Sequence, residues 1–175
     1  MQNAVVRKHR PGQVSEYGRQ LSEKQVLRNA YLLREKQFKK YVQAAVAQSR
    51  RGGDSRYLLL QYLERRLDNT VFRMGFAQTR NQAKQMVSHG HILVNGRRVD
   101  VASYQTKVGD VVAIRPQSME KVLFKNASLA MKKYEAPSWI ALNKEEMKGT
   151  VQGLPTAQEA NPGLDIPLIF EFYSR

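Results

Sequence analysis

The chain has 175 residues, 42% of them hydrophobic, so its composition excludes wholesale disorder. Without a single cysteine it can form neither disulfides nor thiolate zinc sites, and no apolar run approaches the roughly 20 residues of a membrane helix or resembles a secretory signal. Its net charge of +14 favours a polyanionic partner. We therefore expect a cytoplasmic protein without membrane contact.

The first 53 residues read as an extended arm followed by helices. Residues 1–14 show no periodicity and contain the Pro11-Gly12 pair, which is typical of a loop. Ser22 to Gln25 matches a capping box, in which side chains satisfy the free amides at a helix start. Apolar residues at helical spacing continue as far as Val46. The Arg50 to Gly53 stretch then predicts a break.

A long helix is predicted next. Asp54 or Ser55 is a suitable N-cap, and apolar residues recur every four positions from Leu59 to Val71. Gly75 is the predicted end, because glycine tolerates the left-handed backbone that often closes a helix.

A shorter helix follows. Thr79 and Gln82 match a second capping box, and an apolar stripe runs from Ala83 to Val87. Gly90 is its predicted end.

After Gly90 the apolar spacing changes from helical to alternating. Ile92 and Val94 lead to Asn95-Gly96, the strongest short-range signal for a type I′ hairpin. Such a turn fixes the register through three facing pairs: Val94 with Arg97, Ile92 with Val99, and His91 with Asp100. The alternation then places four side chains on the buried face: Ile92, Val94, Val99 and Val101.

The remaining third contains a strand, a helix and a second hairpin. Residues 111–114 read as a strand, and residues 118–134 are helical in pattern. Residues 139–151 predict a hairpin that turns at Glu145-Glu146. Prolines and glycines within 152–167 predict a loop, and the final LIFEFYSR is ambiguous between a strand and a docked helix.

The excess positive charge lies in the first two thirds of the chain. Residues 1–56 carry 13 lysines and arginines against 4 acidic residues, residues 57–115 carry 9 against 4, and residues 116–175 carry 7 against 7. A surface that only needs to be soluble usually carries positive and negative charges interspersed, not an excess of one sign. The distribution therefore predicts polyanion binding by the helices and the first hairpin.

Basic and amide side chains recur at helical spacing in this region. Arg80 and Lys84 are four residues apart on the face opposite the apolar stripe, and Arg66, Asn69 and Arg73 align similarly on the preceding helix. Together with the two arginines of the hairpin, they would surround a phosphate backbone from several sides. RNA is favoured over DNA, since no DNA-binding motif is evident and duplex RNA is recognised by shape, phosphates and 2′-hydroxyls.

Catalytic and metal sites find little support. His89 and His91 flank a glycine, but a third ligand would have to be a carboxylate from elsewhere, so no metal is predicted. Glu145 and Glu146 are adjacent in a predicted turn, which does not suit acid–base catalysis over one substrate. We predict a non-enzymatic protein without cofactors. An RNA-modifying enzyme and a generic RNA-binding protein remain as alternatives.

The stretch LERRLDNTVFRMGFAQTRNQAKQMVSHGHILVNGRRVDVASYQ closely resembles the family of bacterial-type small-subunit ribosomal protein number four. The likeness extends to RPGQ, SEYGRQLSEKQ, KQFKKY, PSWIAL and EFYSR, so it spans nearly the whole chain in order. Pseudouridine synthases, tyrosyl-tRNA synthetases and a heat-shock protein share the central RNA-binding domain. A pseudouridine synthase would need a catalytic aspartate on a further sizeable domain, for which too few residues remain.

The resemblance implies an α+β fold. A helical domain would comprise residues 1–53 completed by 152–175. An α/β domain at 54–151 would carry a small, mainly antiparallel sheet, with the RNA-binding helix–hairpin module at about 62–125.

The resemblance also implies a structural constituent of the small ribosomal subunit, in a bacterium or an organelle. Members of the family bind the 5′ domain of small-subunit ribosomal RNA directly, nucleate assembly, contact ribosomal protein number five at an interface that affects decoding accuracy, and in some cases repress their own operon mRNA. The positions expected to contact RNA are Arg66, Arg73, Arg80, Lys84, His89, His91, Asn95, Arg97, Arg98, Tyr104 and Gln105, with weaker candidates at Arg10, Tyr17, Arg19 and Lys24.

One departure from the family pattern concerns the N-terminus. Family members usually carry a longer basic segment ahead of RPGQ, sometimes with zinc-binding cysteines, and that segment is nearly absent here. Either the chain is a shortened homologue or its true start has been lost.

Overall fold

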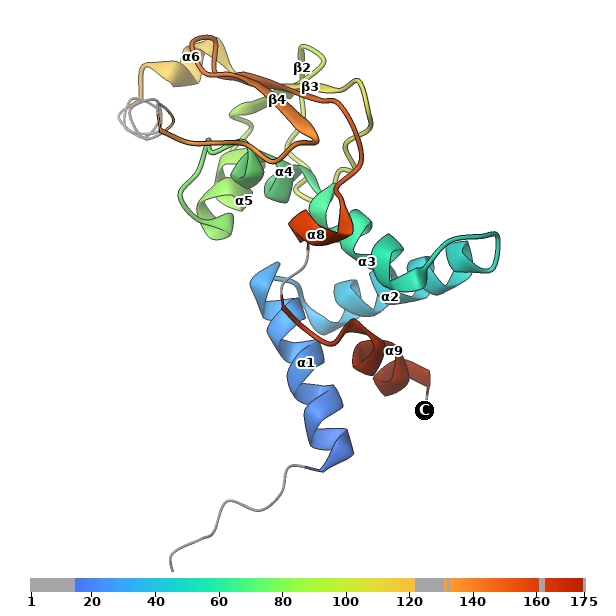
Figure 1. Cartoon of the computed structure of the whole chain (residues 1–175). Helices are drawn as coiled ribbons and strands as arrows, with labels where there is room; N and C mark the ends of the chain where they lie inside the picture. Colours follow the sequence, from blue (N-terminus) through green and yellow to red (C-terminus); the bar gives the residue numbers. More distant parts are fainter. Residues whose placement is uncertain (1–14, 122–130, 132, 161–162, 175) are drawn as a thin grey trace, which may run out of the picture.

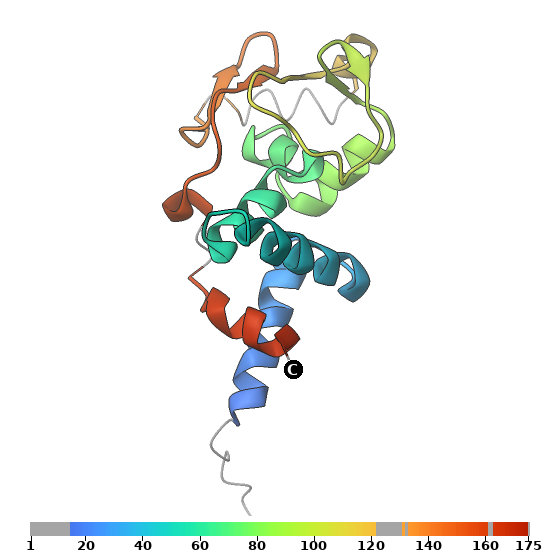
Figure 2. The ribbon, with the colours of Figure 1, turned by 90° about the vertical axis from the view of Figure 1, so that its right-hand side faces the viewer.

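Two hydrophobic cores lie one after the other along the molecule. The computed structural model describes residues 15–121, 131, 133–160 and 163–174. One end of the molecule is helical, and the other carries a sheet covered by two helices (Figures 1 and 2). This arrangement confirms the predicted α+β class. Most of the predicted helix at 118–134 lies outside the described residues.

The helical core is built from the first three helices of the chain and the last one. They are α1 (Glu16–Ala30), α2 (Glu35–Ser49), α3 (Ser55–Glu64) and α9 (Ile166–Ser174). Apolar side chains from all four meet in the interior, among them Leu27, Phe38, Leu63 and Ile169. The end of the chain is therefore a helix, and it lies beside α1 (Figures 1 and 2).

The start of α1 differs from the prediction. The helix begins at Glu16, where the Ser15 hydroxyl accepts a hydrogen bond from the Gly18 amide at 3.1 Å. Ser22 lies inside the helix, so the predicted capping box there is wrong. α1 and α2 are separate because the chain turns at Leu32, whose φ of 52° is left-handed.

The predicted long helix is interrupted after Glu64. α3 ends there and α4 (Leu67–Arg73) begins after Arg66, whose ψ of 137° is extended. A distant loop occupies the break, with the Leu67 amide donating to the Tyr104 carbonyl at 2.8 Å and the Thr106 amide to the Arg65 carbonyl at 2.8 Å. These long-range bonds satisfy backbone groups that a continuous helix would have paired locally.

The interruption also marks the change from one core to the other. We expected the α/β domain to start at residue 54, but Leu59, Leu60 and Leu63 of α3 pack in the helical core. The second core begins with Leu67 of α4.

The second core lies between α4, α5 (Arg80–Ser88) and an antiparallel sheet (Figure 1). Its strands lie in the order β2-β1-β3-β5-β4. Their bounds are β1 Ile92–Val94, β2 Arg97–Arg98, β3 Val111–Ile114, β4 Ile140–Asn143 and β5 Lys148–Val151. β4 and β5 form the second predicted hairpin. Two single-turn helices complete the elements described here, α6 (Pro116–Met119) and α8 (Ala157–Ala160).

The first hairpin has the predicted register. Val94 pairs with Arg97, and the Val99 amide donates to the Ile92 carbonyl at 3.2 Å. Asn95 and Gly96 have φ values of 51° and 77°, as a type I′ turn requires. Val101 does not reach the buried face, since it is 55% exposed.

Glu159 of α8 fastens the loop after β5 to the chain before β4. Its carboxylate accepts hydrogen bonds from the Ser138 amide at 2.6 Å and the Thr156 hydroxyl at 2.7 Å. Partial burial opposes ionisation, but these bonds prevail and lower the pKa of Glu159 to about 2. The carboxylate therefore stabilises the fold above its unfolded pKa, and this contribution is lost as the pH falls toward 2.

Candidate nucleic-acid interface

The predicted surface is built where α5 meets the first hairpin. The Thr79 side chain accepts from the Gln82 amide at 3.1 Å, which confirms the predicted N-cap of α5. α5 buries Ala83, Met86 and Val87. The opposite side of the helix therefore carries Lys84 and Ser88 and leads to His89.

Gly90 lets the hairpin fold back against the end of α5. Its φ is 71°, and the Arg98 side chain lies directly over it, where any Cβ atom would collide. Arg98 is consequently brought toward the two histidines while remaining half exposed. Its only ion pair among the described residues is with Asp100, at 3.8 Å, and the Asp100 side chain is about as exposed as that of Arg98.

His91 is surrounded by positive charge. Its Nδ1 lies 2.9 Å from the Ser118 hydroxyl. Partial burial, followed by the nearby charges of Lys121, His89, Arg115 and Arg98, lowers the pKa of His91 below its usual value. The imidazole rings of His89 and His91 are 6.1 Å apart. We call the five side chains His89, His91, Arg98, Arg115 and Lys121 the cationic cluster.

Two members of the cationic cluster were not predicted. Arg115 comes opposite His91 because Ile114 pairs with Ile92 across β1 and β3, and the Arg115 amide donates to the His91 carbonyl at 2.8 Å. Lys121 follows α6. The sequence did show that a basic residue, Arg115, follows the strand VVAI. Its position beside His91 could not be predicted, because it depends on the pairing of β3 with β1.

Arg66, by contrast, is buried and paired. It is 3% exposed, and its guanidinium donates to both carboxylate oxygens of Asp68, at 3.0 and 2.6 Å, and to the Tyr41 hydroxyl at 2.9 Å. Asn69 is 2% exposed. The expectation of an exposed face with Arg66, Asn69 and Arg73 is therefore wrong, because the break before α4 turns these side chains inward.

Arg73 and Arg80 belong to a hydrogen-bonded network centred on Glu64. The Glu64 carboxylate is 1% exposed and receives two hydrogen bonds from Arg73, at 2.8 and 2.7 Å. It also accepts from the Tyr31 hydroxyl at 2.5 Å and from the Asn69 amide group at 2.8 Å. We call these residues, with Arg80, the Glu64 network.

Arg80 closes the Glu64 network on its exposed side. Its Nε donates to the Asn69 side-chain oxygen at 2.8 Å, and its guanidinium lies 4.8 and 4.6 Å from the rings of Tyr31 and Phe72. Tyr31 belongs to the helical core and Arg80 to α5, so the Glu64 network joins the two halves of the molecule. Arg80 is thus held by the protein rather than displayed beside Lys84.

The predicted amides have internal partners. The Asn95 side chain accepts from the Val111 amide at 2.9 Å and donates to Asp110 at 2.8 Å, which fastens the turn to β3. Gln105 donates to the Tyr62 carbonyl at 3.1 Å beside the helix break. Tyr104 packs against the second core. Arg97, however, is exposed on the hairpin.

Of the four weaker candidates, the three that the structure describes do not join the cationic cluster. Lys24 is buried, with its Nζ 2.8 Å from Glu35 and 4.3 Å from the centre of the Phe172 ring. Tyr17 is half exposed and contacts Phe172, and Arg19 is exposed on α1. Arg10 lies outside the described residues.

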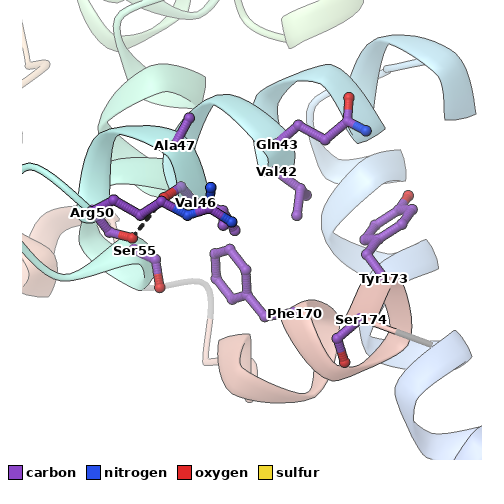
Figure 3. Close-up of a pocket in the computed structure, with 10 residues that line it drawn as sticks. Val42, Gln43, Val46, Ala47, Arg50, Ser55, Phe170, Tyr173 and Ser174 are labelled. Atoms are coloured by element: carbon purple, nitrogen blue, oxygen red, sulfur yellow. Dashed lines mark hydrogen bonds between the residues drawn. The ribbon is translucent and has the colours of Figure 1, made fainter.

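An open groove of about 550 Å³ lies between α2, the start of α3 and α9. Figure 3 shows its aromatic wall, Phe170 and Tyr173, facing Val42 and Val46 of α2. Across the described ranges, no cluster of three or more histidine, aspartate or glutamate side chains is arranged to hold a metal. Within the same ranges, no helix is long and apolar enough to span a membrane.

Comparison with known proteins agrees with this geometry. Residues 1–64 match the ribosomal protein S4/S9 N-terminal domain and residues 65–112 match the S4 domain, so the boundary falls at the break between α3 and α4. Small ribosomal subunit protein uS4 of Chloroflexus aurantiacus is 49% identical over 165 residues, which cover 93% of this chain and 79% of the relative. The chain belongs to the uS4 family.

Two further uS4 proteins show similar agreement. The protein of Roseiflexus castenholzii is 47% identical over 93% of this chain and 79% of its own length. The protein of Persephonella marina is 46% identical over 92% of this chain and 78% of its own length. Membership of the uS4 family identifies a small-subunit ribosomal protein and confirms the prediction of a non-enzymatic role.

Proposed function

We propose that this chain is a structural constituent of the small ribosomal subunit that binds ribosomal RNA through the cationic cluster and the neighbouring Lys84 and Arg97. The decisive observation is the convergence of positive charge from α5, the first hairpin and the segment after β3. Arg115 and Lys121 make no salt bridge with any described residue, so their charges are uncompensated within that part of the chain. Phosphate oxygens would supply the missing negative charge.

The rigidity of the scaffold supports recognition of RNA shape. Arg98 is placed by a type I′ turn and by its packing over Gly90, while Arg115 is fixed by the pairing of β1 and β3. Cations held at set spacings fit one arrangement of phosphates better than others. The partner that family membership suggests is the 5′-domain junction of small-subunit ribosomal RNA.

The family resemblance extends the proposal to subunit assembly and to the accuracy of decoding. We include in the proposed function the nucleation of subunit assembly, contact with ribosomal protein number five and regulation of the chain's own mRNA.

Specific recognition is tested by filter binding of the whole chain to a 5′-domain RNA fragment and to a scrambled RNA of equal length. We expect the 5′-domain fragment to bind more tightly by about 10³-fold at moderate salt, within the range seen for specific over non-specific nucleic-acid complexes. Equal affinities would contradict shape-specific binding and leave a generic polyanion binder.

RNA affinity is expected to increase as the pH falls from about 8 to about 5.5. His91 is disfavoured as a cation in the free protein, and a bound phosphate would favour its protonated form, so binding would take up a proton. The same depressed pKa makes stability fall with acidification through the unfolded value.

The measurement is the dissociation constant against pH for the wild-type chain and for His91→Gln. The variant should show a flatter profile, whereas protonation of the RNA itself affects both proteins equally. Identical profiles would remove His91 from the interface.

A further inference from the structure

The turn of the first hairpin contains the dipeptide most prone to spontaneous deamidation. Asn95 is the only asparagine of the chain that is followed by glycine. In such a pair the backbone nitrogen of the glycine can attack the side-chain amide of the asparagine, because glycine has no side chain to obstruct the approach. The left-handed backbone of the type I′ turn favours these same two residues, so the hairpin acquires this reactivity together with its shape.

The pair is open to water. Asn95 and Gly96 are both exposed, and the turn lies at the sheet end of the molecule, away from the helical core (Figure 1). A Cβ atom added to Gly96 would meet nothing within 4 Å. The Gly96 amide donates to no backbone carbonyl of the described residues. Arg97 and Arg98 follow directly, and their positive charge favours the deprotonated amide nitrogen that makes the attack.

The Asn95 side chain is, however, held by two hydrogen bonds. Its oxygen accepts from the Val111 amide at 2.9 Å, and its nitrogen donates to the Asp110 carboxylate at 2.8 Å. We call these two bonds the turn clamp. The other Asp110 oxygen accepts from the Lys107 amide at 2.8 Å, so the carboxylate that restrains Asn95 is itself fixed. The Asn95 side chain must leave the turn clamp before it can react.

We propose that Asn95 is a site of spontaneous modification in the native chain and that Asp110 sets the rate. When the turn clamp opens, a solvent base removes the Gly96 amide proton and the nitrogen attacks Cγ of Asn95. The new C–N bond closes a succinimide ring as the Cγ–Nδ2 bond breaks, and Nδ2 leaves as ammonia with a proton from water. Water then adds to either ring carbonyl, and cleavage of the bond from that carbonyl to the Gly96 nitrogen gives aspartate or isoaspartate. No oxidant or enzyme takes part.

Neither product fits the turn clamp. In the aspartate product, a carboxylate oxygen replaces the nitrogen that lies 2.8 Å from the Asp110 oxygen. Like charges repel strongly at this separation, so the turn should move away from the start of β3. In isoaspartate the backbone runs through Cγ and is one carbon longer, which disturbs the pairing of Val94 with Arg97. Each product also adds a negative charge beside Arg97 and Arg98.

This inference goes beyond RNA binding, and its tests need no RNA. The first test incubates the whole chain at neutral pH and follows each asparagine by peptide mass spectrometry. Asn143 is a matched internal control, since it is exposed in the β4–β5 turn and accepts from the Glu146 amide at 3.1 Å but precedes a lysine. We expect aspartate and isoaspartate to accumulate at Asn95 and not at Asn143. Product at Asn95 only in the urea-unfolded chain, or in neither state, would overturn the proposal.

The second test changes the turn clamp. Asp110→Ala removes the charged acceptor of the Asn95 nitrogen and should speed deamidation by about 10-fold to 100-fold. Circular dichroism verifies that the variant is folded. If alanine unfolds the chain, Asp110→Asn replaces it, because this variant has the same shape but offers a single oxygen to the two amides that Asp110 accepts from. A folded variant that reacts no faster than the wild-type chain would exclude Asp110 as the control.

The third test introduces the product directly. Asn95→Asp should lower the midpoint of thermal unfolding by about 2–4 °C, because it breaks the bond to Asp110 and sets two carboxylates against each other. Asn143→Asp adds the same charge to the other hairpin turn and should leave the midpoint nearly unchanged. Equal midpoints for the two variants would show that the aspartate product is compatible with the turn clamp, contrary to the proposal.

Discussion

Replacing Glu64 by alanine is expected to lower the free energy of unfolding by about 3–5 kcal/mol, because it leaves a partly buried guanidinium without its partner. The carboxylate accepts two hydrogen bonds from Arg73 and one each from Tyr31 and Asn69. For a chain of this size, the midpoint of thermal unfolding should fall by roughly 10 °C or more. Urea unfolding followed by circular dichroism measures the change.

Two comparison variants test whether the loss of stability in Glu64→Ala comes from the Glu64 network. Glu145→Gln removes an exposed carboxylate from the β4–β5 turn and should leave stability unchanged. Tyr31→Phe removes only the link between the helical core and Glu64, at a cost of about 1.5–3 kcal/mol. If Glu64→Ala is as stable as Glu145→Gln, the Glu64 network does not join the two cores energetically.

Neutralising the cationic cluster is expected to weaken RNA binding by roughly 100-fold in the variant Arg98→Gln, Arg115→Gln, Lys121→Gln. This estimate takes about 1 kcal/mol for each of three lost charge-assisted contacts, and the salt slope should fall by about 3. All three side chains lie at the surface, so the fold should be retained. The measurement is filter binding to the 5′-domain RNA fragment at several salt concentrations.

The matched control for the cluster variant is Lys107→Gln, Lys133→Gln, Lys144→Gln, which removes the same positive charge at other exposed positions. A third variant, Arg80→Gln, removes an arginine that is held by the protein instead of displayed to a ligand. Because Arg80 is bonded to Asn69 and packed on two aromatic rings, its loss should reduce stability. Equal RNA affinities for the cluster variant and the control would exclude the cationic cluster as the interface.

The local elements of the interface followed from short stretches of sequence. The Asn95-Gly96 hairpin and the Thr79 cap were predicted correctly because each depends on the backbone preferences and hydrogen bonds of a few neighbouring residues. His89 and Arg97 are exposed and Lys84 is half-buried, as expected for side chains opposite the apolar stripe and at the tip of the hairpin. Family membership was likewise carried by the sequence alone.

The tertiary structure decided which arginines are available to a ligand. Arg66 and Arg73 share the helical spacing of surface residues, yet the loop at 102–106 inserts after Glu64, divides the helix and turns both side chains toward buried carboxylates. Tyr31 reaches Glu64 across 33 positions, and Arg115 reaches His91 only through the pairing of β3 with β1. Charge and periodicity in the sequence predicted that this chain presents cations to a polyanion, and the resemblance to the uS4 family indicated that the polyanion is RNA. Long-range pairing determined which cations remain available to a ligand, because a buried carboxylate competes with phosphate for the same guanidinium.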